Sequence, residues 1–440
     1  MTRWIGQTFT SETGWDHLET LVDIGDRMAG SEGERVAAEA TRDALSAVGA
    51  RDAHLDEFSI LGWTRGDSEI RADDARYADS HECIALPRSP ADEVTGDLVD
   101  LGYGLPSDFE ETDCEGKVVV ARSDVPSHYD RYLHRREKYY HAVEAGAAAF
   151  VYRNHVDGCL PPTGSVGTDD APLGEIPAVG VSAETGAQLC RRHEGDEVTV
   201  AVTAETGDAT SQNVHAELGP GTEDVVYVTS HVDAHDISTG AMDNGAGTAM
   251  VVELARVLAE REDELETRVR FVCFGAEEVG LVGSAHEADR VDLDRVKTVL
   301  NLDGVVQSRN LALYTHGFDE LEAALDAVAD RYDHPIEAIP NLGPHSDHWP
   351  FVQWGVPGYH AYSENDDSGR GWGHTHADTL DKLEVRDLRE QSVLLADLAV
   401  DLTASSFEVA HRQPDDIADA LEEEDLAEGM KITGDWPYDD

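Results

Sequence analysis

The feature that most limits the fold of this chain is an alternation of apolar strands and amphipathic helices that begins at about Asp224. Short β-branched and aromatic runs fit strands, and longer amphipathic or small-residue patterns between them fit helices. The predicted strands are 225–228, 269–274, 299–302, 311–314 and 358–362, and the predicted helices include 247–259, 321–332 and 388–403. Such alternation is typical of an α/β fold, because helices then cover both faces of one sheet. We therefore predict a mixed, mostly parallel sheet between helices.

A different pattern occupies residues 91–208. Short β runs separated by Gly and Pro fit strands at 117–121, 149–152 and 176–181, and small residues at 140–146 fit a helix. We interpret this stretch as an inserted, smaller α/β domain without chemistry of its own. The main domain is then discontinuous, over 1–90 and 209–410, and an acidic, solvated and partly mobile tail occupies 411–440.

A helix is also predicted near the start of the chain. The segment Ser31-Glu-Gly-Glu34 fits a capping box, so a helix should begin after Ser31 and run to about residue 48. The predicted buried face is Val36, Ala40, Ala44 and Val48.

The charge of the chain excludes some classes of partner. It has 90 acidic and 33 basic residues, which gives a formal net charge of −57. A nucleic-acid backbone would be repelled by this charge. Disorder is excluded over most of the length by the apolar periodicity. We interpret the acidic surface as adaptation to molar salt, which screens the repulsion between carboxylates.

The sequence also bears on location. No apolar run reaches the roughly 18 residues that span a bilayer, and residues 1–12 lack the features of a signal peptide. The 5 cysteines show no CxxC spacing, which argues against a thiolate zinc site and fits a reducing compartment. We expect a cytoplasmic protein that is soluble and does not bind membranes.

Polar residues follow the predicted strands at their carboxyl ends, where open α/β sheets bind ligands. His231 and Asp233 follow the first strand, the pair Glu277-Glu278 follows the second, and Asp303 follows the third. Imidazole and carboxylate groups without thiolates suit zinc, manganese or cobalt in a catalytic site. Two such ions that share a carboxylate can activate a water together, and the Glu277-Glu278 pair can supply one ligand and one base.

In these motifs the chain resembles the co-catalytic zinc aminopeptidases and their relatives, which include plasma glutamate carboxypeptidase. The matching motifs are His231-Val-Asp233, Gly240-Ala-Met-Asp-Asn-Gly245, Phe274-Gly-Ala-Glu-Glu-Val-Gly-Leu-Val-Gly-Ser284, Asn301-Leu-Asp303, Ser346-Asp-His348 and His374-Thr-His-Ala-Asp-Thr379. The resemblance implies a zinc-exopeptidase fold, and looser motifs within 91–208 resemble a protease-associated domain. Some relatives imply a homodimer.

By position, the resemblance also implies a set of metal ligands. Asp243 would bridge two divalent ions, with zinc the first choice and cobalt or manganese as alternatives. His231 and Asp303 would complete the shell of one ion. Glu278 and His374 would complete the shell of the other.

The resemblance assigns the remaining chemistry to two residues that do not bind metal. Glu277 would be the general base, and Asp233 would hydrogen-bond His231 and fix its tautomer. A cis peptide bond is implied between Asp243 and Asn244. His235, His376 and Asp378 are interpreted as non-ligands, with Asp378 orienting its loop.

Other residues near the motifs allow less specific interpretations of their role in the site. The segment Ser346-Asp-His348 is too compact for a serine-hydrolase triad, and we interpret it as lining the substrate side or buttressing the site. Arg370, in the Gly-rich loop before His374, could contact a substrate carboxylate, but we favour a solvated loop arginine. Since no proposed ligand or base lies in 91–208, that insert is expected to be dispensable for metal binding but to affect substrate selection.

The function that follows is removal of the N-terminal residue from peptide substrates by a metal-dependent exopeptidase. A dipeptidase or carboxypeptidase of the same mechanism is the alternative, because the motifs do not distinguish a free amine from a free carboxylate in the substrate. A glutaminyl-cyclase-like transferase and a non-catalytic binding module, as in the transferrin receptor ectodomain, are further alternatives. The complete set of predicted ligands favours hydrolysis over both.

Overall fold

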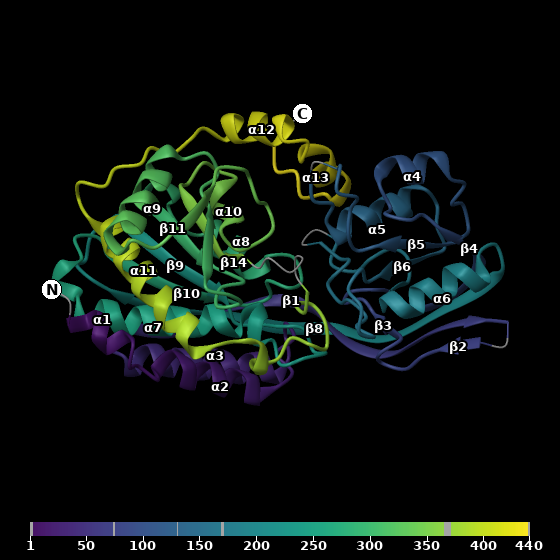
Figure 1. The fold of residues 1–440 in the computed structure, drawn as a ribbon, viewed down its shortest axis with the longest axis horizontal. Helices are drawn as coiled ribbons and strands as arrows, with labels where there is room; N and C mark the ends of the chain where they lie inside the picture. The colour runs from purple at the N-terminus through teal and green to yellow at the C-terminus, as the bar shows by residue number, and fades with distance from the viewer. Residues whose placement is uncertain (1–2, 74, 130, 169–170, 365–370, 439–440) are drawn as a thin grey trace. The chain divides into compact units, whose positions relative to one another are not determined.

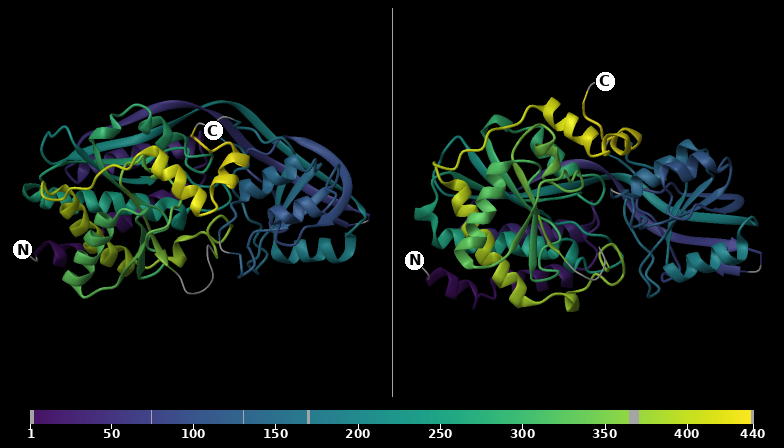
Figure 2. Two further views of the ribbon diagram at one scale, coloured as in Figure 1. Left: turned by 90° about the horizontal axis from the view of Figure 1, so that it is seen from above. Right: turned by 45° about the horizontal axis from the view of Figure 1, so that its top comes forward.

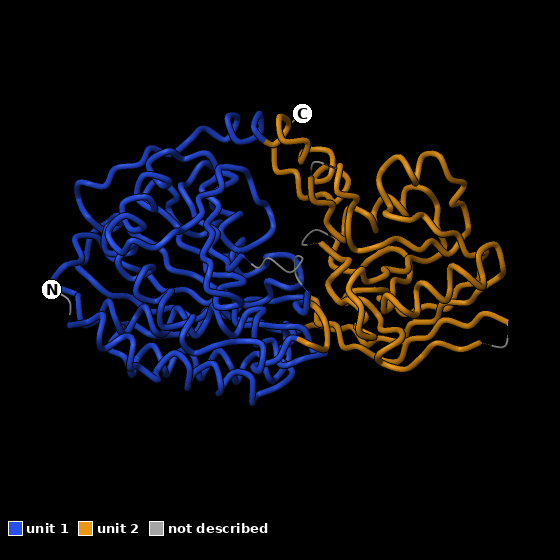
Figure 3. Tube along the Cα trace, in the orientation of Figure 1, with its two compact units in different colours: residues 1–60, 209–373, 378–420 blue, residues 61–208, 374–377, 421–440 orange. Residues whose placement is uncertain are grey.

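The structure is a computed structural model that describes residues 3–73, 75–129, 131–168, 171–364 and 371–438. The chain forms two compact units (Figure 3). Unit 1 contains residues 1–60, 209–373 and 378–420, and unit 2 contains residues 61–208, 374–377 and 421–440. The chain passes from one unit to the other within two long strands, β1 (Arg51–Ala72) and β8 (Glu197–Leu218).

Unit 1 is built on a mixed sheet in which neighbouring strands follow the order β13, β12, β14, β11, β9, β10, β8. Strands β14, β11, β9 and β10 run parallel, whereas β12 is antiparallel to β14 and β8 is antiparallel to β10. The bounds are β9 (Val225–His231), β10 (Arg268–Phe274), β11 (Val296–Leu302), β12 (Asn310–Tyr314), β13 (Ile336–Ile339) and β14 (Gly358–Glu364). The predicted strands and the mostly parallel sheet are confirmed.

Helices cover both faces of this sheet (Figures 1 and 2). Strand β9 shows why, because Val226 and Val228 belong to one apolar core while Val225 and Tyr227 belong to a second core on the opposite face. The first core is closed by α2 (Thr13–Ile24), α3 (Glu32–Ala47), α7 (Ala246–Glu260), α9 (Asp319–Tyr332) and α11 (Val385–Thr403). The second is closed by α8 (Val282–Ala288) and α10 (Trp349–Val352), and α1 (Arg3–Thr8) begins the described chain.

Helix α3 begins as predicted but buries a different face. The Ser31 side chain accepts a hydrogen bond from the Glu34 N–H at 3.0 Å, as a cap should. The predicted face is right only in part. Ala44 and Val48 pack partly buried against the core, but Val36 is exposed, and α3 buries Glu34, Ala37, Ala38, Thr41 and Leu45. The sequence pattern missed this face because two of its members, Glu34 and Thr41, are polar.

Unit 2 contains a smaller sheet with the strand order β8, β4, β5, β6, β7, β3. Its strands are β3 (Cys83–Ala85), β4 (Asp92–Asp100), β5 (Val118–Arg122), β6 (Ala149–Arg153) and β7 (Ala178–Val181), and β2 (Ala75–Tyr77) pairs with β1. Its helices are α4 (Pro106–Glu111), α5 (Arg135–Glu144) and α6 (Ala183–His193). The compact unit begins at residue 61, earlier than the predicted start of the insert at residue 91, because β1 extends into it.

The predicted solvated and mobile tail is instead largely helical. It forms α12 (Pro414–Glu423) and α13 (Ala427–Thr433), and α13 packs on α5 within unit 2. Ile432 contacts the apolar core of that unit, and Arg136 pairs with Asp435 at 2.8 Å. Apolar residues spaced among the acidic ones therefore decide the structure of this segment.

Two further observations concern the described residues. None of their helices is long and apolar enough to cross a membrane. All five cysteines, Cys83, Cys114, Cys159, Cys190 and Cys273, are free thiols.

Candidate active site

The carboxyl ends of parallel strands bring the predicted polar residues of unit 1 to one edge of its sheet. Strand β9 lies between β10 and β11, and all three are parallel. His231 is the last residue of β9, and Asp303 directly follows β11. Glu277 and Glu278 lie in the loop after β10. Ligand sites in open α/β sheets form at this edge.

His231 is the centre of a cluster of carboxylates. It is fully buried, and its Nε2 atom lies 3.3 Å from Asp243 Oδ1, 3.6 Å from Asp303 Oδ1 and 4.0 Å from Glu277 Oε2. Nε2 makes no hydrogen bond within the described part of the chain. A buried, unbonded nitrogen that faces three carboxylates fits a bound divalent cation.

The opposite nitrogen of His231 determines which tautomer is present. Nδ1 lies 3.1 Å from the backbone carbonyl oxygen of Asp233 and 3.5 Å from the Asp233 carboxylate. Because these oxygens only accept hydrogen bonds, the proton lies on Nδ1 and the Nε2 lone pair faces the cluster. The carbonyl oxygen is closer than the predicted carboxylate partner.

The electrostatics of the cluster favour positive charge at Nε2. Burial alone would lower the pKa of His231, but the carboxylates of Glu277, Asp233, Asp243 and Asp303 raise it well above the ordinary value. A divalent cation at Nε2 would take the place of the proton that these carboxylates attract.

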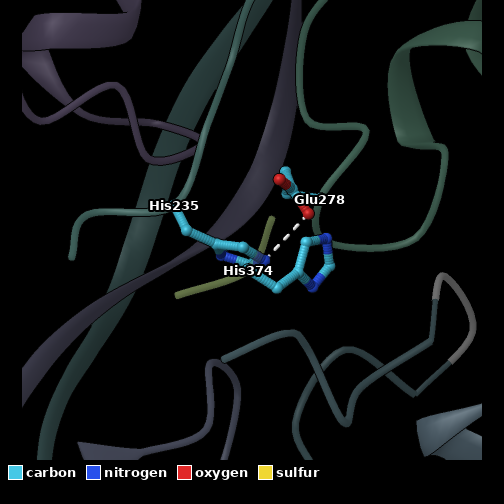
Figure 4. Close-up of side chains that lie close together, drawn as sticks. All are labelled: His235, Glu278 and His374. Carbon is cyan, nitrogen blue, oxygen red and sulfur yellow. Dashed lines mark ion pairs between the residues drawn. The ribbon is translucent and has the colours of Figure 1, made fainter. Parts of the chain in front are cut away.

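The side chains of Glu277 and Glu278 diverge, as adjacent residues in a loop should. Glu277 faces His231, whereas Glu278 Oε2 lies 2.8 Å from His235 Nε2 (Figure 4). The Asp233 carboxylate fixes this loop by accepting hydrogen bonds from the backbone N–H groups of Glu277 (3.1 Å) and Glu278 (3.2 Å). Asp233 therefore positions both the histidine and the glutamate pair.

The pKa of Glu277 is suited to a proton acceptor. Burial raises the pKa of this carboxyl well above its ordinary value. His231 opposes that shift, while Glu278, Asp303 and Asp347 add to it through like charge. A carboxylate with a raised pKa accepts a proton near neutral pH more readily than a solvent-exposed one does.

Asp243 is fixed by the turn between β9 and α7. The peptide bond between Asp243 and Asn244 is cis, as the resemblance implied. Asn244 Nδ2 donates to the Leu302 carbonyl at 2.9 Å, which ties this turn to the end of β11. The Asp378 carboxylate accepts hydrogen bonds from the Met242 N–H (2.6 Å) and the Asp243 N–H (3.2 Å). Asp378 therefore holds the turn that carries Asp243, whereas the sequence predicts that it orients its own loop.

The same turn requires glycine at position 240. Gly240 has a φ of +57°, and a Cβ atom there would lie 2.4 Å from the Ala234 side chain. A left-handed backbone and this close approach together favour glycine over any other residue.

A buried arginine holds the connection between β9 and α7, which carries Asp243. Arg27 is fully buried and donates to the backbone carbonyls of Val232 (3.2 Å), Thr239 (2.7 Å) and Gly240 (2.9 Å). Burial lowers the pKa of Arg27 to about 10, and Asp378, Asp233, Asp243 and Glu278 oppose that shift. The guanidinium therefore stays charged at neutral pH and offsets part of the negative charge of the site.

A chain of hydrogen bonds supports Asp303. Ser346 Oγ donates to Asp303 Oδ2 at 2.7 Å and accepts from Asn301 Nδ2 at 2.8 Å. Thr229 Oγ1 donates to Asn301 Oδ1 at 2.8 Å. Ser346 therefore supports Asp303, which is one of the two roles expected for its segment. It does not pair with His348, whose Nε2 atom lies 2.9 Å from the Gly343 carbonyl oxygen.

The remaining predicted ligand, His374, belongs to the segment 374–377 of unit 2. Its carbonyl oxygen accepts a hydrogen bond from the Thr163 N–H at 2.8 Å, and its Nδ1 lies 3.3 Å from the Thr163 carbonyl oxygen. The neighbouring His376 is bonded to the Ser80 carbonyl at 3.0 Å. Arg370 lies outside the described residues.

Two residues beside this site, His235 and Glu34, make contacts that the sequence does not predict. His235 was interpreted as a non-ligand, yet it contacts Glu278. The only sequence signal for His235 is its position, four residues after His231 and near the end of a strand. Glu34 was predicted as a capping residue, but its carboxylate accepts from the Ser211 hydroxyl (2.6 Å) and the Ala276 N–H (3.2 Å), beside the glutamate pair. Burial raises the pKa of Glu34 to about 8.

A carboxylate and imidazole site at the carboxyl edge of a mostly parallel sheet is typical of a metal-dependent hydrolase. Residues 213–399 match peptidase family M28, and residues 94–189 match the PA domain. The main domain of the chain thus matches peptidase family M28, and its insert matches the PA domain.

Individual relatives agree with this family. The chain is 28% identical over 407 residues to aminopeptidase YwaD of Bacillus subtilis, with 89% of this chain and 82% of that protein covered. It is 26% identical over 412 residues to carboxypeptidase Q of Bos taurus, with 88% and 84% covered. The crystal structure of BSAP, a zinc aminopeptidase from Bacillus subtilis, is similar with a TM-score of 0.70 at 26% identity and covers 91% of this chain and 98% of its own.

Proposed function

We propose that this protein is a zinc-dependent aminopeptidase that hydrolyses the N-terminal peptide bond of peptides with a metal-activated water. The observation that carries the proposal is the position of His231 Nε2, which has no hydrogen bond among the described residues and faces Asp243, Asp303 and Glu277 within 4.0 Å. The match of residues 213–399 to family M28 and the zinc aminopeptidase among the structural relatives support it.

Five side chains would hold the metal. In this proposal His231 and Asp303 would hold one ion, Glu278 and His374 would hold the other, and Asp243 would serve both. Metal ions in such a pair polarise the scissile carbonyl and lower the pKa of water when they are bound. The absence of thiolates in this set fits zinc, cobalt or manganese in a catalytic role.

Glu277 would accept the proton of the attacking water and pass it to the leaving amine. Its carboxylate faces His231 rather than His235, so it is available for the water while Glu278 serves as ligand. The Asp233 carboxylate accepts hydrogen bonds from the backbone N–H groups of both glutamates. These bonds keep Glu277 in place in both its charged and its protonated form.

Preference for a free N-terminus rests on the relatives named as aminopeptidases. The test is a panel of aminoacyl-anilides and N-blocked peptides in high salt, with the cut position read by mass spectrometry. Cleavage of the anilides and of unblocked peptides at their first bond supports the proposal, and cleavage confined to the C-terminal bond contradicts it.

A carboxypeptidase or dipeptidase is the second candidate, because the bovine relative is named carboxypeptidase Q and is covered over 84% of its length. It would use the same metals and the same base. Only recognition of the substrate would differ, so release of the C-terminal residue from N-blocked peptides in the same panel identifies it.

We also propose the cytosol as the compartment. Five free thiols, of which Cys83, Cys114 and Cys273 are buried, fit a reducing environment. Fractionation of cells with an antibody against the protein tests this, and recovery from the culture medium contradicts it.

A further inference from the structure

A cavity of about 270 Å³ in unit 1 shares no residue with the candidate active site. Its walls come from alternate residues of β1 (Asp52, His54, Asp56), from β8 and β10, and from the end of α8 and the turn beyond it. The His54 and His215 rings stack within it, with their centres 5.0 Å apart.

Three side chains of this cavity present possible metal ligands to one point. Asp56, His215 and Glu287 each offer one nitrogen or oxygen atom, and these atoms all lie within 4.8 Å of one another. His215 is only 6% exposed, and its Nε2 atom is buried without a hydrogen-bond partner in the described chain. That nitrogen lies 3.9 Å from Glu287 Oε2. A buried ring nitrogen without a hydrogen bond loses free energy unless a ligand occupies its lone pair.

We propose that Asp56, His215 and Glu287 bind a divalent transition-metal ion, with zinc as the best match, at a site separate from the catalytic metals. Imidazole nitrogen and carboxylate oxygen are both zinc ligands, and water from the cavity can take the fourth position. Cysteine plays no part in it.

Neighbouring groups hold each carboxylate through one of its oxygens. Glu287 Oε1 accepts from the Tyr227 hydroxyl at 2.8 Å and lies 3.5 Å from Arg270, which leaves Oε2 directed toward His215. Asp56 Oδ2 lies 3.2 Å from His286 Nε2 and also contacts Arg290. Such outer contacts orient ligands in known metal sites.

The position of the site assigns it a structural role. It joins β1 and β8 to Glu287 near the end of α8, and α8 begins soon after the Glu277-Glu278 loop. The ion would therefore fix the far end of the helix that follows the catalytic loop. Because it touches neither the base nor the catalytic ligands, its loss should reduce thermal stability more than turnover.

The test compares zinc bound per chain in the full-length protein after equilibration with buffered free zinc. His215→Ala and Glu287→Gln should each bind one ion fewer than the wild type. His54→Ala is the matched control, because it removes the stacked ring but no ligand, and it should bind as many ions as the wild type. The comparison is a difference, so it does not depend on how many ions the catalytic site holds.

Stability gives a second measurement. Zinc should raise the melting temperature of the wild type more than that of Glu287→Gln, which keeps an oxygen for the Tyr227 hydroxyl. Circular dichroism identifies any variant that does not fold, and Asp56→Asn then replaces it. Equal zinc content in the wild type and the folded ligand variants overturns the proposal. Weak zinc binding that the His215→Ala variant retains overturns it as well.

Discussion

Arg27 shows how one buried residue supports the candidate active site. Its guanidinium donates to three carbonyls in the connection that carries Asp243 and supplies positive charge beside several carboxylates. A planar fork of donors can bond several carbonyls at once, which a lysine ammonium cannot do in the same geometry.

Arg27→Met should destabilise unit 1 by about 3–5 kcal/mol, because it leaves buried carbonyls unbonded and buried carboxylates without their cation. Arg27→Lys should restore little of this loss. Denaturant unfolding measures the effect. Arg42→Met, which removes a partly exposed arginine paired with Asp43 on α3, is the control and should change stability little. Equal stabilities for the Arg27 and Arg42 variants would contradict this role.

The sequence predicts residues of this site better than it predicts their supports. His231, Asp233, Glu277 and Asp303 lie at strand ends in recognisable motifs, and the structure brings them together. Arg27 bonds main-chain carbonyls far along the chain, so no pattern of side chains reveals its partners. His235 was missed for a similar reason, since its contact with Glu278 depends on the path of a loop.

At the scale of elements, helix α5 of unit 2 is anchored by a buried lysine. Lys138 is fully buried, and its Nζ donates to the carbonyls of Tyr103 (2.8 Å), Arg122 (2.7 Å) and Asp124 (2.9 Å). These bonds fix α5 to the loops that follow β4 and β5.

Lys138→Met should destabilise unit 2 by about 2–4 kcal/mol, since the apolar side chain leaves three carbonyls without a donor. Lys117→Met, which removes an ion pair with the exposed Asp113, should have little effect. Thermal unfolding of both variants decides the point. A Lys138 variant as stable as the Lys117 variant would show that water replaces the lysine.

The segment that carries His374 is held by Thr163, which lies in a loop of unit 2. The bonds between Thr163 and His374 argue against the expectation that the insert is dispensable for metal binding, because they position a proposed ligand. Sequence could not show this, since the partner of His374 is a main-chain group about 200 residues away.

Thr163→Pro should lower activity about 10-fold or more, because it removes the N–H that donates to the His374 carbonyl, and supports of metal ligands typically contribute 10–100-fold. Thr163→Val keeps that N–H and should retain most activity. Steady-state assays with excess zinc compare the two. Equal losses in both would mean that the backbone bond is unimportant.

At the scale of the whole molecule, periodic apolar patterns predicted most of the unit 1 sheet but not the long strands. β1 and β8 each cover 22 residues and contain many polar or acidic residues, so they lack a continuous apolar pattern. For this reason the sequence does not predict that the compact unit begins at residue 61, within β1. The C-terminal segment was mispredicted because its acidic residues outnumber the few apolar ones that pack.

The formal charge of −57 leads us to predict that the fold loosens in dilute buffer. At 0.01 M salt the Debye length is about 30 Å, against about 3 Å at 1 M, so carboxylates repel one another across each unit. Circular dichroism during dialysis from molar to millimolar salt measures this. An unchanged spectrum and melting temperature would count against adaptation to salt.

Glu277 is proposed as the base and Glu278 as a metal ligand. Metal content measured beside turnover tests this assignment most directly. Glu277→Gln should keep its metal and lose about 10²–10⁴ in kcat, because an amide of the same shape cannot accept a proton. Glu278→Gln should lose metal and regain part of its activity in excess zinc. Removing all metal with a chelator should abolish activity in both and in the wild type. If Glu277→Gln loses metal, or turns over at nearly the normal rate, the assignment of the pair is wrong.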